Sequence, residues 1–281
     1  MKKHLLLLFT ALLPLVASAQ TTVEIDGIWY NLVSMAKVAE VTFKGDSYDS
    51  YNEYSGSITI PATVTYEGVT CSVKNIGDEA FRRCRSLTAI TIPEGVKSIG
   101  ERAFASCESL TSITIPEGVT SIETLSFSGC SSLTSINIPE SVTSIGYSAF
   151  YGCSRLTTIV LPKSVTYIGY EAFANCSELT DVYCNAEEIP YTATKAFHES
   201  NIENTTLHVP ASALDSYRAT APWSEFGNIV ALTDEEMGIE QLTMDNARIT
   251  IYDLHGRRVA TPTKDGIYIV DGKKVMVKTG M

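Results

Sequence analysis

The chain has few of the residues and motifs on which catalytic sites depend. It has four histidines among 281 residues, and no two of them have the spacing of a zinc-protease helix. It lacks a nucleophile elbow, a phosphate-binding P-loop and a dinucleotide-binding glycine motif. It has 7 cysteines but no CxxC pair, so a zinc ribbon is not supported. These absences argue against an enzyme, and we expect neither a metal ion nor a cofactor.

Long apolar runs are also scarce. One run, from Leu5 to Val16, follows Lys2 and Lys3 and precedes Ala17-Ser18-Ala19. A basic start, a short apolar stretch and small residues are typical of a secretory signal peptide, which predicts cleavage before Gln20. The run is shorter than the ~20 residues of a membrane-spanning helix, and no later run is apolar enough to span. We therefore expect a soluble protein that is secreted or held at the outer cell surface.

The chain has fewer basic than acidic residues. Without the two signal lysines, the 21 Lys and Arg fall to 19 against 32 Asp and Glu, a balance of −13. This charge argues against nucleic acid and against anionic lipid as partners.

A repeat dominates the middle of the chain. The stretch from Leu110 to Ile122, LTSITIPEGVTSI, returns with small changes from Leu87, Leu133 and Leu156. The repeating unit is A-F-x-x-C-x-x-L-T-x-I-x-I-P-x-x-V-x-x-I-x-x-x, and Ser126 replaces its alanine once. Five cysteines keep the same 23-residue step: Cys84, Cys107, Cys130, Cys153 and Cys176. A fixed period of this length predicts a solenoid.

Each residue type that recurs in the unit has a physical interpretation. The alternation at Ile113-Thr114-Ile115 predicts a strand with two inward side chains, and Pro116 ends it. Val119 and Ile122 then point inward from a second extended piece, and Ala-Phe begins a helical or 3₁₀ turn. A single unit buries about six apolar side chains, which is too little to order 23 residues, so the units fold only when stacked.

The units from Ala80 to about Pro190 resemble the BspA-like leucine-rich repeats of surface and secreted proteins of Bacteroidetes. The resemblance implies a right-handed coil of short parallel strands. We expect a signal peptide over 1–19, an N-terminal cap over 20–57 and the solenoid over 58–230. Within it, Ile58 begins an expanded first unit with an insertion before Ile76, and Trp223 and Phe226 plug the last coil. A linker over 231–238 and a small β tail over 239–281 follow.

The tail is similar to the C-terminal sorting domains of type IX secretion cargo. The similarity lies in Ile251–Arg257, in Gly266–Val270 and in a closing strand from Lys274 to Lys278. Asp271-Gly272 predicts a hairpin between the last two. The resemblance implies attachment to or release from the cell surface; the alternative is a β appendage that packs on the cap.

Two groups of residues are candidates for a binding surface. Outward residues beside the inward isoleucines predict a flat face of small side chains, and tyrosines gather in the later repeats. Exposed tyrosines are common at binding hot spots. The candidates are Thr91, Thr114, Asn137, Tyr147, Tyr151, Thr158, Tyr167, Tyr170 and Tyr183. The five repeat cysteines are predicted to form an inward ladder of reduced, inert thiols.

Two further interpretations are open at this stage. The threonines of the flat face could order water, or could merely suit a crowded parallel sheet. The acids Asp46, Asp49 and Glu53 could hold calcium, although their spacing matches no EF-hand and favours a solvated loop.

We therefore predict a non-enzymatic module for protein binding or adhesion. The resemblance implies a host extracellular protein or a bacterial surface protein as partner. The alternatives are a structural surface spacer and a carbohydrate-binding accessory protein that uses its tyrosines for stacking.

Overall fold

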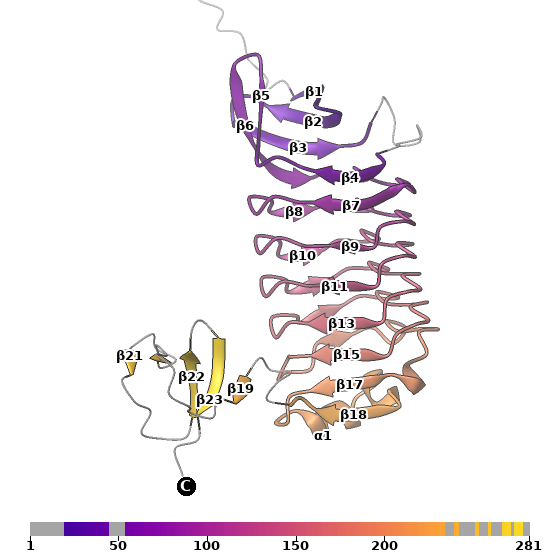
Figure 1. Ribbon diagram of the computed structural model, residues 1–281. Helices are drawn as coiled ribbons and strands as arrows, with labels where there is room; N and C mark the ends of the chain where they lie inside the picture. Colours follow the sequence, from indigo (N-terminus) through magenta and orange to yellow (C-terminus); the bar gives the residue numbers. More distant parts are fainter. Residues whose placement is uncertain are drawn as a thin grey trace, which may run out of the picture.

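The protein was analysed as a computed structural model, which describes residues 20–44 and 54–233 together with the backbone of five strands between 239 and 277 (Figure 1). The predicted signal peptide, the predicted calcium loop and most of the linker lie outside the described residues. No helix among the described residues has the length and apolar character needed to cross a membrane.

The repeats form a β-solenoid of about seven turns. Each coil contributes one strand to a first parallel sheet whose neighbours pair one repeat apart, as in Ser135↔Thr158 and Ile136↔Ile159. An isolated bridge between Thr114 and Asn137 joins its two halves. The strands are β4 (Gly56–Thr59), β7 (Leu87–Thr91), β9 (Ser112–Ile113), β11 (Ser135–Asn137), β13 (Thr158–Leu161), β15 (Asp181–Cys184), β17 (Thr206–Val209) and β18 (Asn228–Ala231).

A second sheet follows the proline corner of each coil. Its two-residue strands also pair one repeat apart, as in Ile122↔Ile145. They are β10 (Ser121–Ile122), β12 (Ser144–Ile145), β14 (Tyr167–Ile168) and β16 (Tyr191–Thr192). The equivalent strand of the preceding coil, β8 (Ser98–Ile99), pairs instead with a strand of the N-terminal cap. Their isoleucines are buried, as predicted for the second extended piece.

The third side of each coil is a chain of turns, not the predicted helix or 3₁₀ helix. Two residues per coil have positive φ, for example Arg102 at 53° and Ser106 at 60° around Ala103–Ala105. A left-handed residue interrupts a helix, so each turn stays short. Hydrogen bonds between coils replace helical ones; the amide of Phe104 donates to the carbonyl oxygen of Ser126 at 2.8 Å.

A column of phenylalanine rings runs through the core. The rings of Phe81, Phe104, Phe127, Phe150, Phe173 and Phe197 are fully or almost fully buried. Adjacent centroids lie 5.1–5.4 Å apart, and adjacent rings are within 11° of parallel. Identical residues in identical coils can stack in this way without voids, which explains the near-identity of the repeats.

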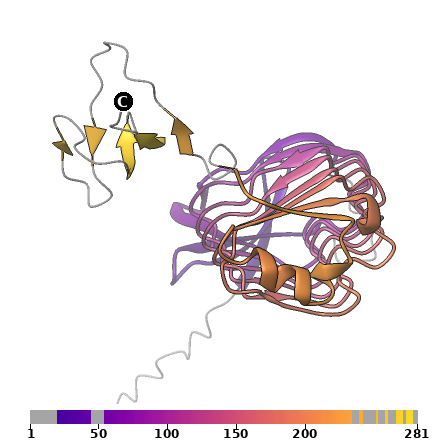
Figure 2. The same ribbon diagram turned by 90° about the horizontal axis from the view of Figure 1, so that it is seen from below.

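Atypical residues close both ends of this column. At the C-terminal end, the rings of Trp223 and Phe226 meet Phe197 edge-on at 5.5 and 5.2 Å, which confirms the predicted plug. They belong to a cap that contains η1 (Ile202–Asn204), α1 (Leu214–Ala219) and η2 (Trp223–Glu225). Figure 2 looks onto this cap from below.

At the N-terminal end, Tyr54 covers Phe81 at a centroid distance of 4.9 Å. Tyr54 ends a stretch of polar residues, whose composition predicts a solvated loop, but its side chain is only 4% exposed. Its hydroxyl accepts a hydrogen bond from the amide of Trp29 and donates one to the carbonyl of Thr42. The free energy gained by burying this aromatic ring over the column exceeds the preference of the neighbouring polar residues for solvent.

The N-terminal cap is a twisted sheet that pairs with β8 of the first regular coil. Its strands are β1 (Gln20–Ile25), β2 (Ile28–Val33), β3 (Val38–Thr42), β5 (Thr63–Tyr66) and β6 (Val69–Ile76). Asp26 and Gly27 form the turn between β1 and β2, and both residues have positive φ as a type I′ turn requires. The insertion before Ile76 is the β5–β6 hairpin.

The tail contains a separate five-stranded sheet in the order β19-β23-β22-β20-β21. The strands are β19 (Ile239–Gln241), β20 (Ile251–Tyr252), β21 (Arg258–Val259), β22 (Gly266–Val270) and β23 (Lys273–Val277). Val270 pairs with Lys273, so the hairpin predicted at Asp271-Gly272 is confirmed.

Candidate binding surface

The nine predicted surface residues do not share one face. Five lie on the outer face of the first sheet: Thr91, Thr114, Asn137, Thr158 and Tyr183. Tyr167 lies on the second sheet, in β14. Tyr147 and Tyr170 lie on the corner that follows the second sheet, and Tyr151 lies in the turns of the third side. Apart from Tyr183, the tyrosines therefore lie on surfaces separate from the flat face.

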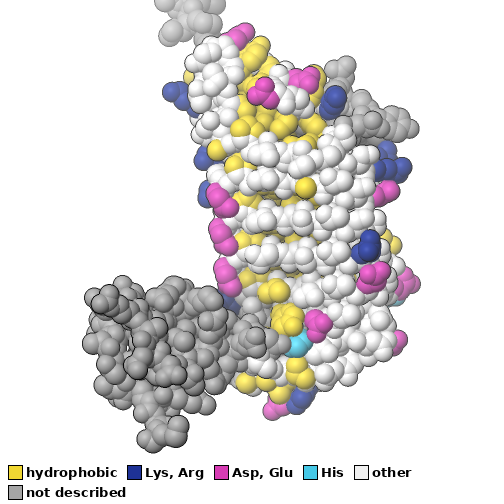
Figure 3. All heavy atoms as spheres, in the orientation of Figure 1, with side chains coloured by type: hydrophobic (Ala, Val, Ile, Leu, Met, Phe, Trp, Pro, Cys, Tyr) yellow, Lys and Arg dark blue, Asp and Glu magenta, His cyan; other side chains and the backbone are white. Residues whose placement is uncertain are grey.

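The outer face of the first sheet carries mostly small side chains, and acidic side chains gather along one edge of it (Figure 3). Near its C-terminal end, Tyr183 stacks on the imidazole of His208 with centroids 4.2 Å apart. The Nε2 atom of His208 lies 3.1 Å from Oδ1 of Asp181. Tyr183 is thus half-buried against its neighbours, which makes it a poor anchor for a ligand.

The corner after the second sheet holds one equivalent residue from each of five coils. We call this the corner row: Asp78, Glu101, Thr124, Tyr147 and Tyr170. A backbone ladder keeps the row in register, because the carbonyl of each member after Asp78 accepts a hydrogen bond from the coil before it. The amide of Leu125 donates to Tyr147, and that of Ser148 donates to Tyr170, both at 2.9 Å. The donors have positive φ, which directs each amide toward the next coil.

Glycines permit this close approach of the coils. A Cβ atom on Gly146 would lie 2.8 Å from the backbone nitrogen of Thr124, and one on Gly169 would lie 2.8 Å from the carbonyl carbon of Gly146. Each of these glycines directly precedes a tyrosine of the corner row. The close approach of the coils brings the side chains of Tyr147 and Tyr170 into contact.

Four exposed tyrosines form two stacked pairs, one within the corner row and one beside it on the second sheet. Tyr147 and Tyr170 have centroids 5.7 Å apart at an interplanar angle of 7°. Tyr167 and Tyr191 have centroids 5.5 Å apart at 10°. We call these four residues the tyrosine strip. Their relative exposures are 48%, 38%, 44% and 68% in the order named, which is high for aromatic side chains that also contact each other.

The sequence analysis missed Tyr191. It pairs with Tyr167 in the parallel ladder of β14 and β16, but it lies 24 residues further on, not 23. One extra residue in the last unit moved it out of the strict period. The Ile-Pro-Tyr motif at 189–191, aligned with Val-Thr-Tyr at 165–167, was the available signal.

One face of each ring in the strip is covered, because each ring stacks on its partner. The Nζ atom of Lys195 lies 5.9 Å from the centroid of Tyr170. The strip presents ring edges, hydroxyl groups and the remaining ring faces to solvent. Such a surface suits hydrogen bonds and edge contacts with a protein.

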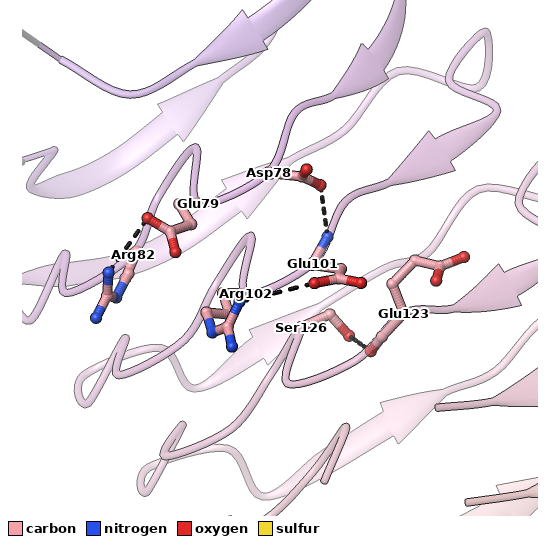
Figure 4. A network of polar contacts seen from close by, with 7 residues as sticks. All are labelled: Asp78, Glu79, Arg82, Glu101, Arg102, Glu123 and Ser126. Carbon is pink, nitrogen blue, oxygen red and sulfur yellow. Dashed lines mark hydrogen bonds and ion pairs between the residues drawn. The ribbon is translucent and has the colours of Figure 1, made fainter. Parts of the chain in front are cut away.

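The N-terminal half of the corner is polar (Figure 4). Carboxylates come from three successive coils, those of Asp78, Glu101 and Glu123. The carboxylate of Asp78 accepts a hydrogen bond from the amide of Glu101 at 2.8 Å. Glu123 replaces the corner glycine of its coil and accepts a hydrogen bond from Ser121. The hydroxyl of Ser126 donates to the carbonyl of Glu123, which gives the serine a role at the alanine position.

The repeat cysteines are core residues. Each is fully buried, and all seven cysteines of the described chain are free. The thiols of four donate to the carbonyl of the phenylalanine 26 residues earlier, as Cys130 does to Phe104 at 3.2 Å. Burial raises the pKa of Cys130 and of Cys176 to about 12 and holds the pKa of Cys107 and Cys153 well above 9.0. These thiols stay protonated and are poor nucleophiles.

Within the described residues, no group of three His, Cys, Asp or Glu side chains is placed to hold a metal ion. A depression at the C-terminal cap is lined by Phe197, His198, Glu203 and Pro222 among others. It is open to solvent, and Ser200, which also lines it, donates its hydroxyl to the carbonyl of Phe173.

The family model for the BspA type leucine rich repeat region matches six copies over residues 51–180 and 99–217, which is more than half of the chain. The chain belongs to the BspA-type leucine-rich repeat family. No curated protein matches it.

Two solved structures show the same fold. A leucine-rich repeat protein from Bacteroides ovatus is 25% identical, with a TM-score of 0.51, and the match covers 78% of this chain and 70% of that one. The leucine-rich repeat protein of T. pallidum is 23% identical, with a TM-score of 0.53, covering 75% and 86%. The membership confirms the predicted solenoid of parallel strands.

Proposed function

We propose that this protein is a non-enzymatic binding module of the cell exterior, which uses the tyrosine strip to bind another protein. The observation that carries the proposal is the strip itself. Four tyrosines, each at least 38% exposed, project from the corner row and from the adjoining second sheet. Tyrosine contributes large contact area at a small cost in conformational entropy and is enriched at interface hot spots.

The rigidity of the strip supports this function. The rings contact each other at 5.5 and 5.7 Å and stand on hydrogen-bonded coils. A partner would therefore meet side chains that are already ordered. Preorganised side chains lose little freedom on binding, so more of the contact energy appears as affinity.

A carbohydrate ligand is the less favoured alternative. A sugar ring stacks on an open aromatic face, and stacking within each pair leaves at most one such face on each tyrosine. A structural spacer is the second alternative, and it would need no exposed aromatic side chains at all. The strip is better explained by protein binding than by either of these.

Export belongs to the same proposal. The N-terminal sequence supports cleavage before Gln20, and the tail sequence supports sorting through the type IX route. Seven free cysteines are compatible with an oxidising exterior because every one of them is buried.

The test is a comparison of the mature chain, 20–281, with two variants. The first replaces Tyr147, Tyr167, Tyr170 and Tyr191 with serine. The matched control replaces Tyr151 with serine, because Tyr151 is 39% exposed but lies away from the strip. All three are passed over immobilised extracellular-matrix proteins, bacterial surface proteins and glycans, after circular dichroism has shown that they are folded.

We expect the wild-type chain and the Tyr151 control to retain a protein partner that the four-tyrosine variant loses. Retention by all three chains alike would reject the strip as the binding site. A glycan that is lost only by the four-tyrosine variant would favour the carbohydrate alternative instead.

A further inference from the structure

We infer that the partner of the tyrosine strip is a basic, extended protein segment that lies along the solenoid axis, with its Lys or Arg residues against the N-terminal half of the corner row. This inference rests on the proposed function and specifies the chemistry of the partner.

The first step is the continuity of the surface. The corner row runs without interruption from Asp78 and Glu101 through Thr124 to Tyr147 and Tyr170. One backbone ladder joins all five coils: the amide of Glu79 donates to Glu101 at 2.9 Å, and that of Arg102 donates to Thr124 at 3.0 Å. A ligand that contacts the tyrosines and continues along the axis therefore reaches the carboxylates next.

The second step is the charge of the polar half. It contains four carboxylates, from Asp78, Glu79, Glu101 and Glu123, and two guanidinium groups (Figure 4). Glu79 is held by Arg82 at 3.2 Å, and both side chains are mostly covered. Glu101 is 3.7 Å from Arg102 in a solvent-exposed pair, which is weak.

Asp78 and Glu123 complete this half of the surface. Within residues 54–233, neither carboxylate has an ion-pair partner; Asp78 accepts a backbone hydrogen bond and Glu123 accepts one from a serine. Each carboxylate retains acceptor capacity for a cation. The excess of negative charge attracts a basic ligand and repels an acidic one.

The third step is the length of the surface. Neighbouring strands in a sheet lie ~4.8 Å apart, so the four steps from Asp78 to Tyr170 span roughly 20 Å. An extended chain rises ~3.3 Å per residue, and about six residues cover that distance. A short linear segment thus reaches from the carboxylates to the tyrosines.

The experiment is the selection of a displayed library of random eight-residue peptides on the mature chain, with the four-tyrosine variant as the subtractive target. Two matched variants carry the same change of net charge. Asp78→Asn with Glu123→Gln removes carboxylates from the corner row. Glu94→Gln with Glu117→Gln removes exposed carboxylates from the proline corner, which precedes the second sheet.

We expect the enriched peptides to concentrate Lys and Arg in one half and apolar or aromatic residues in the other. The strongest peptide should bind the Asp78/Glu123 variant roughly three- to tenfold more weakly than the wild type, as expected for two exposed ion pairs. Its affinity for the Glu94/Glu117 variant should stay within about twofold. Raising the salt concentration should weaken its binding to the wild type.

Two results would overturn the inference, and they are distinguishable. Enriched peptides that need the tyrosines but have no basic bias, or that bind both charge variants equally, would leave the strip as a protein site and reject the basic partner. If no peptide is retained better by the wild type than by the four-tyrosine variant, both the inference and the proposed site are wrong.

Discussion

The hydroxyl of Ser200 donates a hydrogen bond to the carbonyl oxygen of Phe173 and so takes the place of a cysteine thiol. One coil earlier, the thiol of Cys176 donates to Phe150 at 3.4 Å. Ser200 also accepts a hydrogen bond from the amide of Cys176 at 3.1 Å. The last coil therefore closes the ladder with a stronger donor that also serves as an acceptor.

Replacement of Ser200 with alanine should lower the free energy of unfolding by about 1–3 kcal/mol, because a buried carbonyl and a buried amide both lose their partner. Replacement with cysteine should cost less, since the thiol restores the donor found in the other coils. Urea denaturation measures both values. Equal losses for the two variants would contradict the prediction, because they would show that a thiol does not replace the hydroxyl as donor at this position.

Replacement of Gly169 with alanine should destabilise the protein by about 1–3 kcal/mol. The added Cβ would lie 2.8 Å from the backbone of Gly146 and would push two coils apart beneath Tyr147 and Tyr170. Gly95→Ala is the control, because its Cβ would have 3.6 Å to the nearest atom. Thermal unfolding of both variants checks the prediction, which fails if Gly169→Ala is as stable as the control.

Replacement of Tyr54 with phenylalanine should keep the stacking on Phe81 but lose the hydrogen bonds to Trp29 and Thr42. We expect a loss of about 1–3 kcal/mol from the two backbone groups left without a partner. Tyr54→Leu should cost more, because it removes the ring as well. A Phe variant as stable as the wild type would mean that Tyr54 acts only through its ring.

The buried thiols predict a loss of stability at high pH. Burial raises the pKa of Cys130 and Cys176 to about 12 in the folded chain, against 9.0 for an unburied thiol. Between these values the unfolded chain has released protons that the folded chain retains, so the free energy of unfolding falls as pH rises. The slope approaches about 1.4 kcal/mol per pH unit for each such thiol. Below pH 9 these thiols should have no effect.

Denaturant titrations from pH 7 to pH 11 measure this dependence, with Cys130→Ala as a variant of reduced slope. The same thiols should fail to react with a thiol reagent until the chain unfolds. Rapid labelling of the native protein at pH 8 would contradict the assignment.

Much of the fold was predictable because the same apolar, proline and cysteine positions recur in each 23-residue unit. The period placed Ile113 and Ile122 inside, Pro116 at a corner and Cys107 in the core, and each of these is confirmed. The third side was not predictable from Ala-Phe alone. Its geometry depends on residues with positive φ such as Arg102 and Leu125. Arginine and leucine rarely adopt that conformation, so the sequence does not indicate it.

The candidate site was only partly predictable. The 23-residue step correctly predicted that Tyr147 and Tyr170 stack. The step could not show that Tyr183 lies on the first sheet, away from the tyrosine strip. That placement depends on where each coil turns from one sheet to the next. The step also overlooked Tyr191, whose coil contains one more residue.

The column of phenylalanine rings has a consequence for how such proteins change length. Every interface between inner coils contains the same ring contact at nearly the same distance. Duplication of one 23-residue unit in the gene therefore adds one equivalent interface, deletion removes one, and both caps keep their contacts. The distance between the carboxylates and the tyrosines of the corner row can thus lengthen or shorten in single-coil increments, and selection can fit the reach of this surface to a partner without redesigning the core.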